Sequence, residues 1–170
     1  LADRMLATLR AAEKQEGDIR GAQSAALKIV PGSASTPEWD ARFDLRVDDH
    51  PTPIEELVRL VRLRRAQIVD SEGHDLLAQG KTDAALTRWK DARNLAPELE
   101  EIGFWQAVAL ADANPDTMSV SLAARIMDAA LGDDPNLENW LELVRRLADS
   151  GMIKRDGAAE ELLEAFENTR

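Results

Sequence analysis

The spacing of apolar residues changes along the chain and separates a short mixed region from a long helical one. The first apolar positions recur at helical spacing: Leu1, Met5, Leu6 and Leu9. They predict an amphipathic helix over residues 1–16, which ends before Gly17. Residues 23–30 are β-branched at their end and close at a Pro-Gly pair, which is typical of a strand. Residues 43–47 alternate apolar and polar side chains and predict a second, half-buried strand.

A helix start follows the second strand almost at once. Thr52 is expected at the N-cap, Pro53 at the first helical position and Glu55 as the partner that completes a capping box. From there to the end of the chain, helical periods are separated by Gly, Pro and Asn-Pro dividers, and no strand is expected. The predicted helices cover residues 53–79, 82–94, 98–112, 118–131, 136–149 and 156–168.

The link between the second strand and this helix carries Asp48, Asp49 and His50. Polar groups at a strand-to-helix corner are well placed to orient a substrate or a water molecule. The structural alternative is that the two acids satisfy backbone donors and favour the positive end of the helix dipole. Both interpretations remain open on the residues alone.

A repeat lies within the helical region. Ala85, Trp89, Ala92 and Pro97 recur 38 residues later as Ala123, Met127, Ala130 and Pro135. The first copy, with Gly73 and Leu76 on the preceding helix, resembles a tetratricopeptide unit, in which small residues allow two helices to approach and a large one fills the groove. Val69 stands where that motif has Trp. Trp89, Trp105 and Trp140 are expected to pack between helices, as are Met118, Met127 and Met152.

The net charge of −11 on 170 residues argues against nucleic-acid binding. Four arginines on the first long helix could bind an anionic group: Arg59, Arg62, Arg64 and Arg65. The alternative is a solvated face with a Glu55–Arg59 pair. Cysteine is absent and the two histidines are 24 residues apart, so we expect no metal and no cofactor. No apolar run is long enough to span a membrane, so we expect a soluble protein. The residues do not identify its compartment, and a cytoplasmic location is favoured over a periplasmic one.

Two strings resemble a known bacterial family of unknown function with an Ntn-hydrolase-like fold. They are GDIRGAQSAAL at residues 17–27 and LRVDDHPTPIEELVRL at residues 45–60. Residues 80–112, GKTDAALTRWKDARNLAPELEEIGFWQAVALAD, resemble a helical extension of that family that is described as peptidoglycan-binding. The resemblance implies a remnant of an αββα sandwich, with one helix and two strands, over residues 1–50. An all-α tetratricopeptide-like helical array would then form residues 51–170.

The resemblance also implies a set of polar site residues. Carried over by position, they are Asp18, Arg20, Gln23, Ser24, Asp48, Asp49 and His50. Arg20 would clamp a substrate carboxylate, unless it forms a structural ion pair with Asp18. Ntn hydrolases attack an amide with the first residue of the mature chain, and Leu1 has no nucleophilic side chain. We therefore expect a C-terminal portion of a longer protein, without a catalytic residue of its own.

The expected role is that of a binding or assembly module attached to an Ntn-hydrolase-like half, in the same polypeptide or a companion chain. Peptidoglycan or a peptide would be its ligand, and a homo-oligomer is a further expectation. Two alternatives stay open. One is that the chain forms part of an active amide or peptide hydrolase once joined to its upstream half. The other is a free-standing helical-repeat scaffold whose concave face binds a protein partner.

Overall fold

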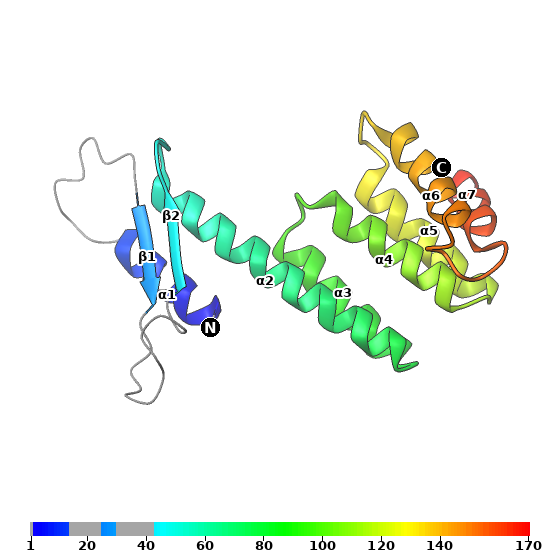
Figure 1. The fold of residues 1–170 in the computed structure, drawn as a ribbon, viewed down its shortest axis with the longest axis horizontal. Helices are drawn as coiled ribbons and strands as arrows, with labels where there is room; N and C mark the ends of the chain where they lie inside the picture. Colours follow the sequence, from blue (N-terminus) through cyan, green and yellow to red (C-terminus); the bar gives the residue numbers. More distant parts are fainter. Residues whose placement is uncertain (1, 14–24, 30–42) are drawn as a thin grey trace. The chain divides into compact units, whose positions relative to one another are not determined.

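The computed structural model describes residues 2–13, 25–29 and 43–170, and the chain divides into two compact units (Figure 1). Unit 1 is Leu1–Arg65 and unit 2 is Ala66–Arg170. The division falls within the long helix α2, Pro53–Ala78. Most described residues are helical, as the helical periods predict. The sequence-based domain boundary after residue 50 stays a prediction.

Unit 1 contains α1 (Ala2–Glu13), β1 (Ala25–Ile29), β2 (Phe43–Val47) and the first turns of α2. The two strands pair antiparallel, in a register that runs from Ala25 opposite Val47 to Ile29 opposite Phe43. A small apolar core joins α1, β2 and α2 through Met5, Leu6, Leu9, Val47, Leu57 and Val61. The apolar stripe of α1 and the inward position of Val47 therefore agree with the periodicity of the sequence.

Unit 2 contains the rest of α2 and five further helices: α3 (Thr82–Leu95), α4 (Glu100–Ala113), α5 (Thr117–Leu131), α6 (Leu137–Asp149) and α7 (Ala158–Glu167). Their bounds agree with the predicted ones to within two residues, so the helical array is confirmed. The core of unit 2 extends through α3 to α7, and its largest fully buried side chains include Trp89, Phe104, Leu110, Met127 and Phe166.

Small residues bring the helices of unit 2 close together. A Cβ on Gly73 of α2 would lie 2.3 Å from Cδ1 of Trp89 on α3, and one on Gly103 of α4 would lie 2.4 Å from Cβ of Ala130 on α5. Trp89 is fully buried, and no hydrogen-bond partner of its Nε1 is found among the described residues. The indole thus fills a space that exists because Gly73 has no side chain.

Glycine also ends the long helix. Gly80 has φ +72°, a left-handed conformation that L-residues adopt with strain, and Lys81 N–H donates back to the Leu76 carbonyl at 2.9 Å. Within the described residues, no helix is long and apolar enough to cross a membrane.

Candidate functional site

The predicted corner between β2 and α2 is organised by His50. The Thr52 N–H donates to His50 Nδ1 at 3.1 Å, and the Thr52 hydroxyl lies 3.5 Å from the same nitrogen. Because Nδ1 accepts, the neutral ring carries its proton on Nε2. Asp48 and Asp49 are exposed and Asp49 has φ +53°. The helix begins at Pro53 as predicted, but in this described segment the Thr52 hydroxyl faces His50, so the expected capping box with Glu55 is wrong.

Arg59 is held by a neighbouring carboxylate on α2. Its Nε and Nη2 donate to the two carboxylate oxygens of Glu56 at 2.7 and 2.6 Å. This hydrogen bonding and the charge of Arg59 hold the pKa of Glu56 below its usual value. The sequence predicted Glu55 as the partner, which is wrong by one residue. Arg62 and Arg65 also have interaction partners, so these arginines are not a set of unpaired cations.

Four of the predicted site residues lie outside the described part of the chain: Asp18, Arg20, Gln23 and Ser24. The proposed set therefore stays a prediction as a whole. The described members, Asp48, Asp49 and His50, do lie together on one short link, with His50 fixed by the helix start.

A groove of about 320 Å³ lies on unit 2, where the first helices of successive hairpins come together. Helix α4 supplies four of the nine lining residues, and α2, α6 and the segment after α6 supply the rest. The lining residues are His74, Trp105, Val108, Ala109, Asp112, Leu147, Met152, Ile153 and Lys154. We refer to this surface as the α4 groove.

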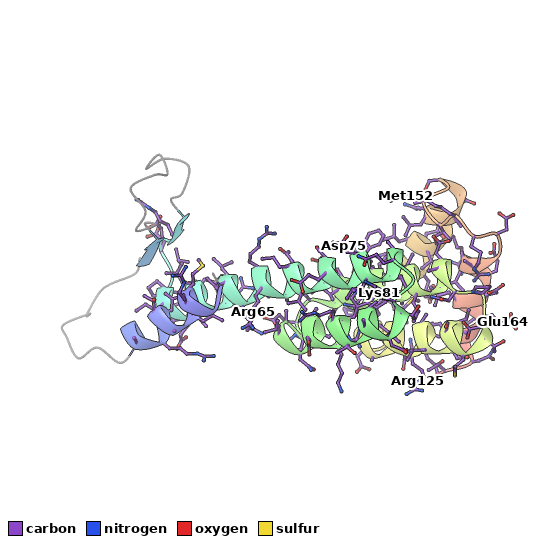
Figure 2. All side chains as sticks on the ribbon, turned by 90° about the horizontal axis from the view of Figure 1, so that it is seen from below. Arg65, Asp75, Lys81, Arg125, Met152 and Glu164 are labelled. Atoms are coloured by element: carbon purple, nitrogen blue, oxygen red, sulfur yellow. The ribbon has the colours of Figure 1, made fainter. Side chains whose placement is uncertain are left out.

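Two large apolar side chains of the α4 groove face solvent. Trp105 is 40% exposed and stands edge-on to Phe104, with ring centroids 5.2 Å apart. Met152 is 63% exposed and projects from the segment after α6 (Figure 2). The sequence predicted that both side chains pack between helices. It made the same prediction for Met118, which is 81% exposed. Those three predictions are wrong, whereas Trp89 and Met127 are fully buried as predicted.

A polar cluster connects α2, α3 and α4 beside this groove. Gln106 is fully buried, its amide nitrogen donates to Asp70 Oδ1 at 2.6 Å, and its amide oxygen accepts from Arg93 Nη1. Burial lowers the pKa of Arg93, and the charge of Asp70 opposes that shift. His74 Nε2 lies 3.4 Å from Asp70 Oδ2, and its ring stands edge-on to Trp89. The cluster orients His74, which lines the α4 groove.

The segment after α6 is fixed at the groove by Asp112. Oδ1 of Asp112 accepts the backbone N–H groups of Lys154 and Arg155 at 2.8 and 2.6 Å. The Arg155 guanidinium donates to the Ala111 carbonyl at 2.9 and 3.1 Å and also to both carboxylate oxygens of Glu161. That pairing raises the pKa of Arg155 and lowers the pKa of Glu161. One wall of the groove is therefore tied to the end of α4.

The described residues contain a further hollow outside the α4 groove. This hollow, of about 510 Å³ between α5 and α7, has a mixed polar and apolar lining, which includes Glu161, Glu164 and Val120. No group of three or more His, Asp or Glu side chains in the described ranges is arranged to hold a metal ion. The α4 groove combines apolar side chains with an exposed aromatic ring, that of Trp105.

Comparison with known protein families places a match at the N-terminal end of the chain. Residues 1–57 match a family described as of unknown function (DUF1028). The match covers α1, both strands, the Asp48–His50 corner and the first turn of α2, while every residue of the α4 groove lies beyond it. No curated protein matches the chain, and no solved structure does. The N-terminal third is thus similar to that family of unknown function.

Proposed function

We propose that the chain is a non-catalytic binding and assembly module. In this proposal, unit 1 joins the module to an Ntn-hydrolase-like domain, and unit 2 holds a peptide partner in the α4 groove. The observation that carries the proposal is the α4 groove itself, with Trp105 and Met152 exposed over an apolar floor. Exposed aromatic and Met side chains in a concave surface are typical of binding sites for partner chains.

The repeat pattern supports a tetratricopeptide-like array. Gly73 and Gly103 allow close approach of paired helices, and Ala85, Ala92 and Ala123 are fully buried at the predicted repeat positions. Arrays of this kind present a surface built from successive first helices, and α2, α4 and α6 all contribute to the groove.

A peptide fits the α4 groove better than peptidoglycan. Val108, Leu147 and Ile153 give the lining an apolar floor, which suits aliphatic side chains. A glycan ligand requires many hydrogen-bonding groups along its length. The only polar side chains in this lining are those of His74, Asp112 and Lys154, together with the Trp105 indole nitrogen.

Support for the assembly role comes from the β-ribbon. In the described residues, β1 and β2 pair with each other alone, so each strand has one edge without a neighbouring strand. Addition to a larger sheet would satisfy these open edges. A remnant of an αββα sandwich, as the family resemblance implies, would have this property.

The test is selection of peptides on the immobilised full chain from a random library, followed by affinity measurement against a Trp105→Ala variant. Met118→Ala is the matched control, because Met118 is also exposed but lies outside the α4 groove. We expect selected peptides to lose affinity with the first substitution and keep it with the second. Peptides that ignore both substitutions, or enrichment of the chain on sedimented peptidoglycan alone, would refute the peptide-binding function.

The alternative function, part of an active amide hydrolase, is favoured by the orientation of His50 at the corner. Joining the chain to its upstream family half and assaying amide hydrolysis distinguishes the two. A His50→Gln substitution that abolishes such activity would favour the enzyme.

A further inference from the structure

We infer that the partner of the α4 groove is a cationic peptide segment, in which a Lys or Arg side chain neighbours an aliphatic one. This inference rests on the proposed peptide-binding function and adds the chemistry of the ligand. Its first support is the distribution of charge. Residues 66–170 hold 21 acidic and 10 basic side chains, whereas residues 1–65 hold 11 of each. The whole net charge of −11 therefore belongs to unit 2, and its field attracts cations.

The second support is the carboxylate of Asp112 in the groove lining. Its Oδ1 is held by two backbone N–H groups, so the carboxylate is fixed in position. The nearby Arg155 guanidinium is engaged by Glu161 and the Ala111 carbonyl. Among the described residues, no Lys, Arg or His side-chain nitrogen forms a direct ion pair with Asp112; together with the hydrogen bonds to Glu161, its charge acts at longer range on the Arg155 guanidinium and helps to raise the Arg155 pKa. A fixed anionic group beside apolar side chains favours a ligand cation with an aliphatic stem.

The third support is the position of Trp105 relative to Asp112. They are seven residues apart on α4, which is two helical turns, so both lie on one face about 10 Å apart along the axis. Neighbouring same-side residues of an extended peptide are about 7 Å apart. A cation at Asp112 and an aliphatic side chain near Trp105 and Met152 are therefore within reach of one short segment.

Lys154 is the only cationic side chain in the groove lining, and it provides a test of sign. It is exposed, so its ammonium can turn into solvent when a cation binds. If the ligand is cationic, removal of this charge tightens binding. If the ligand is anionic, the same substitution weakens binding.

The experiment uses the full chain and three labelled heptapeptide probes, Gly-Leu-Ser-Lys-Ser-Leu-Gly and its Gln and Glu analogues, in fluorescence anisotropy titrations at low salt; in an extended peptide, both Leu side chains lie on the same side as Lys. We expect the Lys probe to bind about tenfold more tightly than the Gln probe, as one charge-assisted contact predicts. The Glu probe should bind most weakly. Affinity for the Lys probe should fall with added salt, because the charges are exposed.

The variants separate charge from folding. Asp112→Asn keeps an oxygen for the two backbone N–H groups and removes the charge. We therefore expect the affinity for the Lys probe to fall about tenfold and the affinity for the Gln probe to change little. Lys154→Gln should raise the affinity of the chain for the Lys probe. Glu138→Gln is the matched control, since Glu138 is an exposed acid outside the lining.

Some outcomes overturn the inference alone. Equal binding of the three probes, tightest binding of the Glu probe, or weaker binding of the Lys probe to Lys154→Gln would do so, while library peptides that depend on Trp105 would leave the proposed function standing. Self-association that is lost in Trp105→Ala would assign the groove to a second copy of the chain. That result would overturn both this inference and the proposed peptide-binding function. Failure of every probe and every library peptide to bind would also overturn both.

Discussion

Replacement of Gly73 by Ala tests whether the pair of Gly73 and Trp89 holds α2 against α3. The added Cβ would lie 2.3 Å from Cδ1 and 2.4 Å from Nε1 of Trp89, a ring with no exposed surface into which it could move. Overpacking of this kind costs about 1 to 3 kcal/mol. Ala gains about 1 kcal/mol over Gly in a helix, which offsets part of the loss. Because two contacts fall far below van der Waals distance, we expect a cost at the upper end of this range, about 3 kcal/mol, and therefore a net loss of about 2 kcal/mol.

Urea unfolding followed by circular dichroism and Trp fluorescence measures this change in the free energy of unfolding. Ser71→Ala is the matched control, since Ser71 is exposed on the same helix and its replacement adds no contact. In a Trp89→Leu background the smaller side chain leaves room, so Gly73→Ala should become neutral or stabilising. A stabilisation of about 1 kcal/mol by Gly73→Ala in the otherwise unchanged chain would refute the reasoning, because only helix propensity would then be acting.

Three further predictions follow from buried or capping contacts. Gln106→Leu should lower the free energy of unfolding by about 2 to 3 kcal/mol in urea titrations, because Asp70 and Arg93 each lose a buried partner. An unchanged free energy of unfolding would show that these hydrogen bonds do not stabilise the fold. Asp116→Ala should destabilise α5 at pH 7, whereas Asp116→Asn should not, because Asn also caps. Hydrogen bonds from Ser119 lower the pKa of Asp116, so its contribution is complete above the unfolded pKa of about 3.9 and is lost as pH falls through the lower folded pKa. The difference in melting temperature between the unchanged chain and Asp116→Ala should therefore become smaller in acid. An undiminished difference would show that the charge of Asp116 does not contribute. Leu57→Ala should cost about 2 to 5 kcal/mol in unit 1, seen as faster hydrogen exchange in residues 2–13 and 43–47 with residues 82–167 unchanged.

The secondary structure was predictable because each element carries its own boundaries in the sequence. Gly80 ends α2 with a positive φ, and the strict alternation of residues 43–47 gives β2 with the predicted bounds. Such signals act over a few residues, so no knowledge of the tertiary structure is needed. The repeat positions Ala85 and Ala123 were buried for the same reason, since small residues are needed wherever two helices cross closely.

The α4 groove was not predictable in the same way. Helix α4 is apolar almost all round, and both Phe104 and Val108 are buried, so periodicity could not show that the face with Trp105 is exposed. That face depends on where α2 and α6 stop covering α4. One signal was available: Gln106 interrupts the apolar run IGFWQAVALA, and a polar residue in such a run indicates a buried polar partner.

The sequence predicted which types of side chain pair near the start of α2, but not which residue supplies each partner. The sequence placed a carboxylate beside Arg59, yet Glu56 at three residues and Glu55 at four satisfy the same rule. At the start of α2, the His50 ring competes with the capping box for Thr52, and local motifs do not predict which contact forms.

The attachment of Arg155 to the end of α4 changes how unit 2 would come apart. Repeat arrays contact only adjacent repeats and tend to fray from their ends, one hairpin at a time. Here Ala111 and Asp112 at the end of α4 bind the guanidinium and the backbone N–H of Arg155, which lies just before α7, more than forty positions later in the chain. Release of α7 together with Arg155 would leave the Ala111 carbonyl and the Asp112 carboxylate without these donors. Helices α4 to α7 should therefore open together as one cooperative unit, and proteases should meet an all-or-none barrier at this end.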